Sequence, residues 1–263
     1  MFNDARLINF IANALALLAV LAMLVSVVVW LVQRPYFVID RIRIEPMQSE
    51  ALHYVSPASV RASIAGRVAG NFFTVDLDET RQLLETVPWV RHARIRRVWP
   101  DTLSVQLEEH QPLALWNEDQ MINTWGEAFR ANLGELPDDA GLPRFMGPDN
   151  SERLVVQRYA ELARWFAPLS VSVRQISLSP RYAWSVELSD GVLLNLGRDP
   201  AADVADPHGR SGAKSFATRI QRFVQAWPVL AQRVDGRTIE SADLRYTNGF
   251  AITLAPVPTS STK

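Results

Sequence analysis

The sequence predicts an α+β protein with one N-terminal transmembrane helix, a small β-α-α-β-β domain and a strand-rich β domain with packed helices. Three observations support this prediction. Residues 7–32 carry no charge, residues 37–109 alternate between strand and helix patterns, and residues 113–254 contain many short strand patterns and two helical ones. Of the 263 residues 48% are hydrophobic, which is enough for more than one core.

Residues 7–32 form the predicted membrane helix. As a helix this run measures about 39 Å at about 1.5 Å per residue, and a bilayer has a hydrocarbon core of about 30 Å. The aromatic side chains of Trp30 and Tyr36, together with Arg34, are typical of residues that anchor a helix at the membrane interface. The sequence therefore predicts a membrane anchor with these three residues at its far end.

A cleaved signal peptide is the alternative interpretation of this segment. The apolar part of a signal peptide is about 7–15 residues long and ends at small residues. Here the run is longer and ends in Val-Val-Trp-Leu-Val, which favours an uncleaved anchor. The charges do not decide the orientation, because Arg6 is offset by Asp4 while Arg34, Arg41 and Arg43 follow the helix.

The first folded region begins with a predicted strand at 37–46. Ser56-Pro57 then opens a helix, because serine caps helix starts and proline fits the first turn. After an extended piece at 71–75, a second helix starts at Asp76 or Asp78, and two strands follow at 93–99 and 102–109. This order predicts a three-stranded sheet with both helices on one face.

The second folded region is rich in strands. Helices are predicted at 151–166 and at 216–234, where Pro228 kinks or divides the helix. Asp190-Gly191 and Asn248-Gly249 are hairpin signals. Residues 134–150 read as a loop. The predicted strands lie at 113–116, 121–123, 176–178, 183–188, 192–196, 243–246 and 250–254, and residues 255–263 read as a disordered tail.

Charge and composition exclude several functions. The chain has 27 basic and 28 acidic residues, whereas a nucleic-acid-binding protein usually has a basic excess. In the basic stretch 91–97, Arg94 and Arg96 are expected to be partly neutralised by Glu108 and Glu109. There is no cysteine, the four histidines lack metal-ligand spacing, and no catalytic or phosphate-binding motif occurs. We therefore expect neither an enzyme nor a cofactor, metal, nucleic acid or small-molecule substrate.

The last predicted strand is the candidate partner-binding site. A terminal strand after a hairpin often lies at a sheet edge, where unpaired N–H and C=O groups can bind another chain. Tyrosine on the neighbouring strand is a common interface anchor. The alternative is that these side chains only complete the core. The candidate residues are Tyr246, Phe250, Ala251, Ile252, Thr253 and Leu254, with Arg181 and Tyr182 as weaker candidates.

Several motifs, in this order after one membrane segment, resemble the FtsQ/DivIB family of bacterial cell division proteins. The resemblance covers nearly the whole chain. The matching segments are Gly-Asn-Phe-Phe-Thr-Val-Asp-Leu at 70–77, Val-Pro-Trp-Val-Arg-His-Ala at 87–93, Arg-Arg-Val-Trp-Pro-Asp-Thr-Leu at 96–103, Leu-Glu-Glu-His-Gln-Pro-Leu-Ala at 107–114, Leu-Gly-Arg at 196–198 and Asp-Leu-Arg-Tyr at 243–246.

The resemblance implies a scaffold of the division septum in the inner membrane, with its N-terminus in the cytoplasm and its bulk in the periplasm. It implies that the β domain binds FtsB and FtsL, and it makes FtsK, FtsW and FtsI further expected partners. It also implies that the small domain has the POTRA fold. The expected segments are a cytoplasmic tail at 1–6, the membrane helix at 7–34, the POTRA domain at 35–109, the β domain at 110–255 and the tail at 256–263.

Three features depart from the family pattern. The cytoplasmic tail is very short, an extra loop lies at 199–215, and Leu254 stands where relatives can have tryptophan.

A different class, POTRA-type chaperones or adaptors in envelope protein assembly, is the alternative function. That class usually has several POTRA units and a barrel of about ten-residue alternating strands, and the sequence contains neither pattern.

Overall fold

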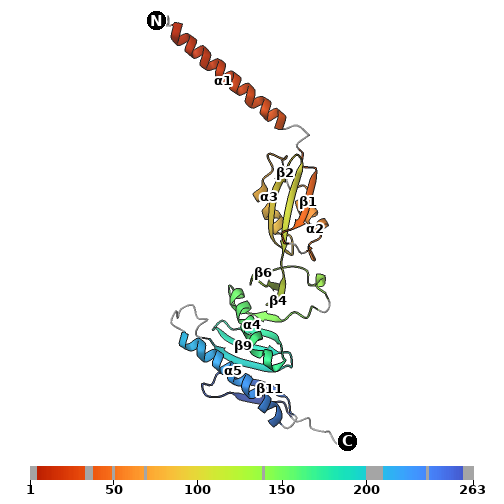
Figure 1. Ribbon diagram of the computed structural model, residues 1–263, viewed down its shortest axis with the longest axis vertical. Helices are drawn as coiled ribbons and strands as arrows, with labels where there is room; N and C mark the ends of the chain where they lie inside the picture. Colours follow the sequence, from red (N-terminus) through yellow and green to blue (C-terminus); the bar gives the residue numbers. More distant parts are fainter. Residues whose placement is uncertain are drawn as a thin grey trace. The chain divides into compact units, whose positions relative to one another are not determined.

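The computed structural model describes most of the chain, which forms two compact units. The units are Met1–His110 and Gln111–Lys263, and Figure 1 colours them along the sequence. The described residues are 5–32, 38–48, 51–67, 70–137, 140–199, 210–234 and 237–256. The predicted anchors Arg34 and Tyr36 lie outside these ranges, as do residues 1–4 of the short tail, residues 200–209 of the extra loop and residues 257–263.

Helix α1 is the membrane segment that the sequence predicts. It comprises Ala5–Val32, and within it Asn9–Trp30 is long and apolar enough to cross a membrane. The helix is apolar on every side, and none of the membrane-spanning window is buried against protein. A helix of this kind needs an apolar solvent such as a bilayer. Trp30 lies near its C-terminal end with 57% of its surface exposed.

The first folded unit contains the predicted three-stranded sheet and two helices. The strand order is β1-β3-β2, with β1 parallel and β2 antiparallel to the central β3. The predicted β-α-α-β-β order is thus confirmed. The elements are β1 (Arg41–Pro46), α2 (Pro57–Ile64), α3 (Leu77–Glu85), β2 (Val90–Val98) and β3 (Thr102–Glu109).

Local chemistry accounts for both helix starts in this unit. The Ser56 hydroxyl accepts the Ser59 N–H at 3.0 Å, and Pro57 occupies the first turn of α2. Asp76 Oδ1 accepts two N–H groups at the start of α3, so Asp76 and not Asp78 is the cap. Such a cap is worth about 1 kcal/mol, because it satisfies donors that have no partner inside the helix.

Two expectations for this unit are wrong in detail. The first strand starts at Arg41 and not at 37, because the paired strand β3 itself begins at Thr102 and leaves earlier residues without a partner in the ladder. Residues 71–74 form a turn and not an extended piece, since the Asn71 side chain accepts the N–H groups of Phe73 and Thr74.

Two glutamates at the end of β3 have structural roles. The Glu109 carboxylate accepts the backbone N–H groups of three consecutive residues before α2, at 2.6–2.9 Å. Glu108 pairs with Arg91 at 3.1 Å. The expected neutralisation of Arg94 and Arg96 by these glutamates is therefore wrong, because both carboxylates are turned toward other donors.

The second unit is built on one nine-stranded sheet. Its strand order is β12-β11-β10-β9-β8-β7-β4-β5-β6. Helix α4 connects the parallel strands β7 and β8, and helix α5 connects the parallel strands β10 and β11. The strands are β4 (Pro112–Trp116), β5 (Gln120–Asn123), β6 (Ala128–Phe129), β7 (Arg144–Met146), β8 (Val173–Leu178), β9 (Ala183–Leu188), β10 (Leu193–Arg198), β11 (Ile239–Asp243) and β12 (Ala251–Leu254), and the helices are α4 (Glu152–Phe166) and α5 (Arg210–Arg233), with short 3-10 helices at Leu133–Glu135 and Ala167–Leu169.

The core of this unit lies between the sheet and its two helices. Helix α4 contacts β8, and helix α5 contacts β10. Leu162 and Phe166 on α4 and Phe223 on α5 are fully buried, together with Phe145 and Leu188 from the sheet. Burial of an aromatic or leucine side chain contributes about 1.5–3 kcal/mol to the free energy of folding. These side chains therefore stabilise the packing of both helices on the sheet.

Two predictions for this unit are wrong, and one of two alternatives for α5 is excluded. The region 134–150 is not only a loop, because it contains β7, a three-residue strand in the middle of the sheet. Helix α5 continues through Pro228, so the alternative in which Pro228 divides the helix is excluded. The predicted strand at 243–246 ends at Asp243, so Asn248-Gly249 is part of a seven-residue connection between β11 and β12 and not a two-residue hairpin.

Candidate functional site

Strand β12 forms one edge of the nine-stranded sheet. It pairs with β11 on one side, and no other strand in the described parts of the chain pairs with its second side. The side chains of Ala251 and Thr253 are exposed, and those of Ile252 and Leu254 are half-buried against the core. Strand β12 is therefore the last strand of this sheet among the described residues, with its two larger side chains turned inward.

The direction of the backbone groups on β12 follows from the neighbouring strands. The N–H of Leu244 donates to the Asn195 carbonyl on β10 at 2.8 Å. Backbone groups alternate in direction along a strand, so those of Asp243 face β12, where Asp243 is paired with Ala251. Ala251 therefore bonds to β11, and we infer that the N–H of Ile252 points to the open edge.

Tyr246 lies beside this edge, in the connection between β11 and β12 and not on a strand. Its side chain is 56% exposed. The backbone around it is held by helix α5, since the Arg222 guanidinium donates to the Thr247 carbonyl at 2.8 Å and Arg219 donates to the Arg245 carbonyl at 3.5 Å. A large aromatic side chain is thus displayed on a restrained backbone, which is typical of an interface anchor.

Arg245 and Asp243 brace the start of the same connection. The Arg245 guanidinium donates to both Asp243 oxygens, with the shortest contact at 2.6 Å. The side chain also lies over Gly197, where an added Cβ would come within 2.9 Å of Arg245 Cγ. The hydrogen bonds from Arg245 hold the pKa of Asp243 below its usual value and raise the pKa of Arg245.

Phe250 precedes β12 and bears on the two interpretations of this strand, as part of the core and as a partner-binding edge. Its ring meets the Phe223 ring of α5 edge-on, with 5.5 Å between centroids, and it is half-buried against the core. Phe250, Ile252 and Leu254 thus contribute to packing through their side chains. The open hydrogen-bonding side of β12 belongs to the backbone, so a core role for these side chains and strand addition at the edge are compatible.

Arg181 and Tyr182 are not adjacent to this edge. They form the turn between β8 and β9, where Tyr182 has a positive φ of 57° and donates its N–H to the Ser179 carbonyl. The turn lies at the same end of the sheet as Tyr246, but strands β10 and β11 separate β9 from β12. Arg181 is exposed, whereas Tyr182 packs against the core.

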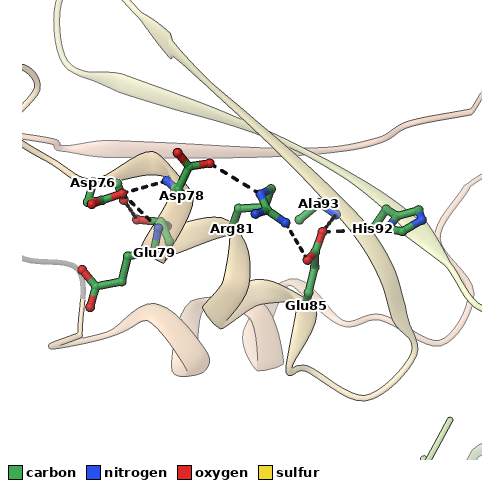
Figure 2. Close-up of polar contacts among 8 residues, drawn as sticks. Asp76, Asp78, Glu79, Arg81, Glu85, His92 and Ala93 are labelled. Atoms are coloured by element: carbon green, nitrogen blue, oxygen red, sulfur yellow. Dashed lines mark hydrogen bonds and ion pairs between the residues drawn. The ribbon is translucent and has the colours of Figure 1, made fainter.

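A second polar cluster links α3 to β2 in the first unit (Figure 2). The Glu85 carboxylate accepts the Ala93 N–H at 3.2 Å and a hydrogen bond from Arg81 at 2.8 Å, and it approaches His92 at 3.9 Å. The Glu85 oxygens therefore accept hydrogen bonds that connect helix α3 to strand β2.

In the part of the chain that is described, no group of three or more His, Cys, Asp or Glu residues is arranged to hold a metal ion.

Known proteins match both units. Residues 114–245 match the family model of the C-terminal region of cell division protein FtsQ/DivIB, and residues 49–110 match that of the FtsQ-type POTRA domain. A cell division protein FtsQ from Bordetella pertussis is 66% identical over 258 residues, which cover 98% of this chain and 94% of the relative. The chain belongs to the FtsQ/DivIB family.

Further FtsQ proteins extend the match. One from Burkholderia pseudomallei is 48% identical over 97% of this chain and 95% of its own length. Another, from Nitrosospira multiformis, is 34% identical over 95% of this chain and 98% of its own length. Membership in the family supports a role in cell division, and helix α1 fits a single-pass membrane protein.

Two arginines that hold the backbone near this edge have no distinctive sequence pattern. Arg219 and Arg222 lie on α5, about one turn apart, and read as ordinary exposed arginines of an amphipathic helix. Only the parallel crossover from β10 to β11 brings them to the carbonyls around Tyr246. Asp243 and Arg245 are two residues apart, and this spacing is the signal by which their ion pair could have been found.

The Asp243–Arg245 pair makes stability depend on pH. Because the folded-state pKa of Asp243 is depressed, the stabilising contribution is present above the usual aspartate pKa of about 3.9 and is lost as pH falls through the folded value. We expect Asp243→Asn to be less stable than the parent at pH 7, and the difference to shrink below about pH 4. Urea titrations of the full chain in detergent, with hydrogen exchange of β11 as the readout, measure this. A difference that stays constant with pH would contradict it.

Proposed function

We propose that this protein is a non-enzymatic scaffold of the division machinery in the inner membrane. It links early and late division proteins at the septum by binding an FtsB/FtsL-type complex through strand β12. FtsK, FtsW and FtsI are further proposed partners. The single observation that carries the proposal is the position of β12 at the end of the sheet order, with a free hydrogen-bonding side in the described chain.

The chemistry of the edge supports strand addition. An extended partner segment would complete the ladder through backbone hydrogen bonds, while the small exposed side chains of Ala251 and Thr253 leave room for it. Tyr246 would supply the aromatic anchor at the end of the added strand. Arg181 and Tyr182 lie directly before β9, which β10 and β11 separate from β12, so they would touch only a partner that extends beyond the edge.

The proposed topology places the N-terminus in the cytoplasm and the two folded domains in the periplasm, anchored by α1 with Trp30, Arg34 and Tyr36 at the periplasmic interface. The proposed segments keep the bounds expected from the sequence: tail 1–6, membrane helix 7–34, POTRA domain 35–109, β domain 110–255 and tail 256–263.

Depletion of the protein in its own bacterium tests the role in division. We expect depleted cells to grow into filaments, and a fluorescent fusion of the full chain to restore division and to gather at midcell. A Tyr246→Ala fusion should reach midcell but recover less of the FtsB/FtsL-type complex in pull-downs, because it lacks the exposed anchor.

Two outcomes would count against the proposal. Normal division after depletion, with fluorescence spread over the envelope, would remove the septal role. Full recovery of the partner complex by the Tyr246→Ala fusion would show that Tyr246 is not part of the interface, while leaving the septal role intact. Tyr246→Phe, which keeps the aromatic ring, is the matched control.

A further inference from the structure

The turn between β2 and β3 exposes the largest aromatic side chain of the first folded unit. Trp99 has 74% of its surface exposed, and its neighbour Val98 has 38%. Trp89, which immediately precedes β2, is by contrast almost fully buried. Tryptophan combines a large apolar body with one polar N–H, and in membrane proteins it is enriched where apolar and wet surroundings meet.

This turn lies at the end of the POTRA sheet at which the chain arrives from the membrane helix. The backbone N–H groups of Asp40 and Arg41 donate to the Asp101 carbonyl at 3.1 and 3.4 Å, and Arg41 is paired with Thr102. The opposite end of the sheet, at Glu109, leads into the β domain. The turn is thus connected directly to the residues that follow α1.

The length of chain after α1 limits how far this end can move from the membrane. Helix α1 ends at Val32, and Asp40 is eight residues later. A fully extended chain covers at most about 3.3–3.6 Å per residue, so these eight residues reach no farther than about 29 Å. The exposed Trp99 is therefore tethered within reach of the lipid headgroups on the side where α1 ends.

A basic cleft of about 520 Å³ opens beside the start of β1. It is lined by Asp40, Arg41, Ile42, Arg43, Arg61 and Thr102. Arg41 is paired with Asp101 at 2.9 Å, and Arg43 approaches Glu45 at 3.9 Å. Within the described residues Arg61 makes no ion pair, so its guanidinium is available to an anion.

The cleft has the chemistry that binds phosphate esters. A guanidinium presents several N–H donors in a fixed plane that matches phosphate oxygens. Asp40 and Asp101 reduce the positive charge, which favours a shallow surface contact with many headgroups over one tightly held anion. An exposed tryptophan next to arginines is the combination found on protein surfaces that rest on anionic bilayers.

We propose that this end of the POTRA domain, formed by Trp99 and the arginine cleft, docks onto the anionic phospholipid surface of the membrane that α1 crosses. Docking fixes the height of the POTRA domain above the bilayer. The contact is independent of β12 and of the partner-binding proposal.

The absence of cysteine allows a single-site test on the full chain. Val98→Cys carries a fluorescent label at the turn, and Thr86→Cys, an exposed residue at the opposite end of the same domain, is the matched control. Both proteins are reconstituted into vesicles of phosphatidylglycerol and phosphatidylcholine that contain a quencher on the lipid headgroup. We expect several-fold stronger quenching at position 98 than at position 86.

Variants then test which residues and which lipids cause the quenching at position 98. Trp99→Ser and Arg61→Gln, each in the Val98→Cys background, should reduce the quenching toward that of the control, and vesicles of phosphatidylcholine alone should do the same. Because Trp99 and Arg61 are exposed, circular dichroism should stay unchanged. Equal quenching at both labels, or quenching that survives Trp99→Ser, would overturn the proposal. Loss of septal recruitment by Trp99→Ser without any lipid quenching would instead identify the turn as a protein-binding site.

Discussion

An Ile252→Pro variant is expected to lose binding of an FtsB/FtsL-type complex by at least about thirtyfold, since removal of a central interface contact costs about 2 kcal/mol or more. The N–H of Ile252 points to the open edge, so proline removes a hydrogen bond to the partner and places its ring in the path of an added strand. The measurement is the dissociation constant of the detergent-solubilised full chain for the purified complex.

Two neighbouring substitutions serve as controls. Ile252→Val keeps the N–H and most of the half-buried side chain, so binding should stay close to that of the parent. Thr253→Pro removes a bond to β11 instead and should release the whole strand, which hydrogen exchange of β11 would reveal. A folded Ile252→Pro protein that binds as tightly as the parent would rule out strand addition at β12.

An Arg158→Ala variant is expected to destabilise the β domain by about 3–5 kcal/mol, because it removes the guanidinium that neutralises the buried Asp199 carboxylate. Arg158 also bonds to Glu161 at 2.7 Å. Its guanidinium lies 4.7 Å from the Phe216 ring centroid and 5.3 Å from that of Trp184. One side chain thus joins α4, the end of β10 and α5 inside the core.

Urea titration of the full chain, with hydrogen exchange of α4 as the readout, measures the effect on this domain alone. Arg164→Ala is the matched control, because Arg164 lies on the same helix but is exposed, and such changes usually stay within about 0.5 kcal/mol. Replacing Arg158 by Met and Asp199 by Leu together should restore much of the stability, since an apolar pair leaves no buried charge. An unchanged unfolding midpoint for Arg158→Ala would show that the ion pair contributes nothing.

The elements with strong local signals could be predicted from the sequence. Ser56-Pro57 opens α2 and Asp76 caps α3, because a cap needs only a side chain and the N–H groups two or three residues later. Strand β3 matches its prediction residue for residue, since its apolar residues Leu103, Val105 and Leu107 alternate with polar ones and are all buried. The family motifs lie between residues 70 and 246 and indicate the FtsQ/DivIB family, to which the chain belongs.

The candidate site was predicted less completely. The existence of β12 was predicted, but the neighbouring strand was placed at 243–246 because Asn248-Gly249 resembles a two-residue hairpin. The true partner strand begins at Ile239, where pairing with the parallel strand β10 determines the register. Tyr246 therefore lies in the connection. A local turn signal cannot report a pairing that is made with residues 40 or more positions earlier in the chain.

The sequence by itself determined the membrane helix, the order of the POTRA elements and the family, because each rests on residues close together in the chain. Only the tertiary structure decided that β7 joins the middle of the sheet, that β12 pairs with residues 239–243, that Arg158 is buried, and that Trp99 shares one end of the POTRA sheet with Arg41. These features depend on contacts between distant residues, whose free energy is gained only when the whole sheet and its helices come together.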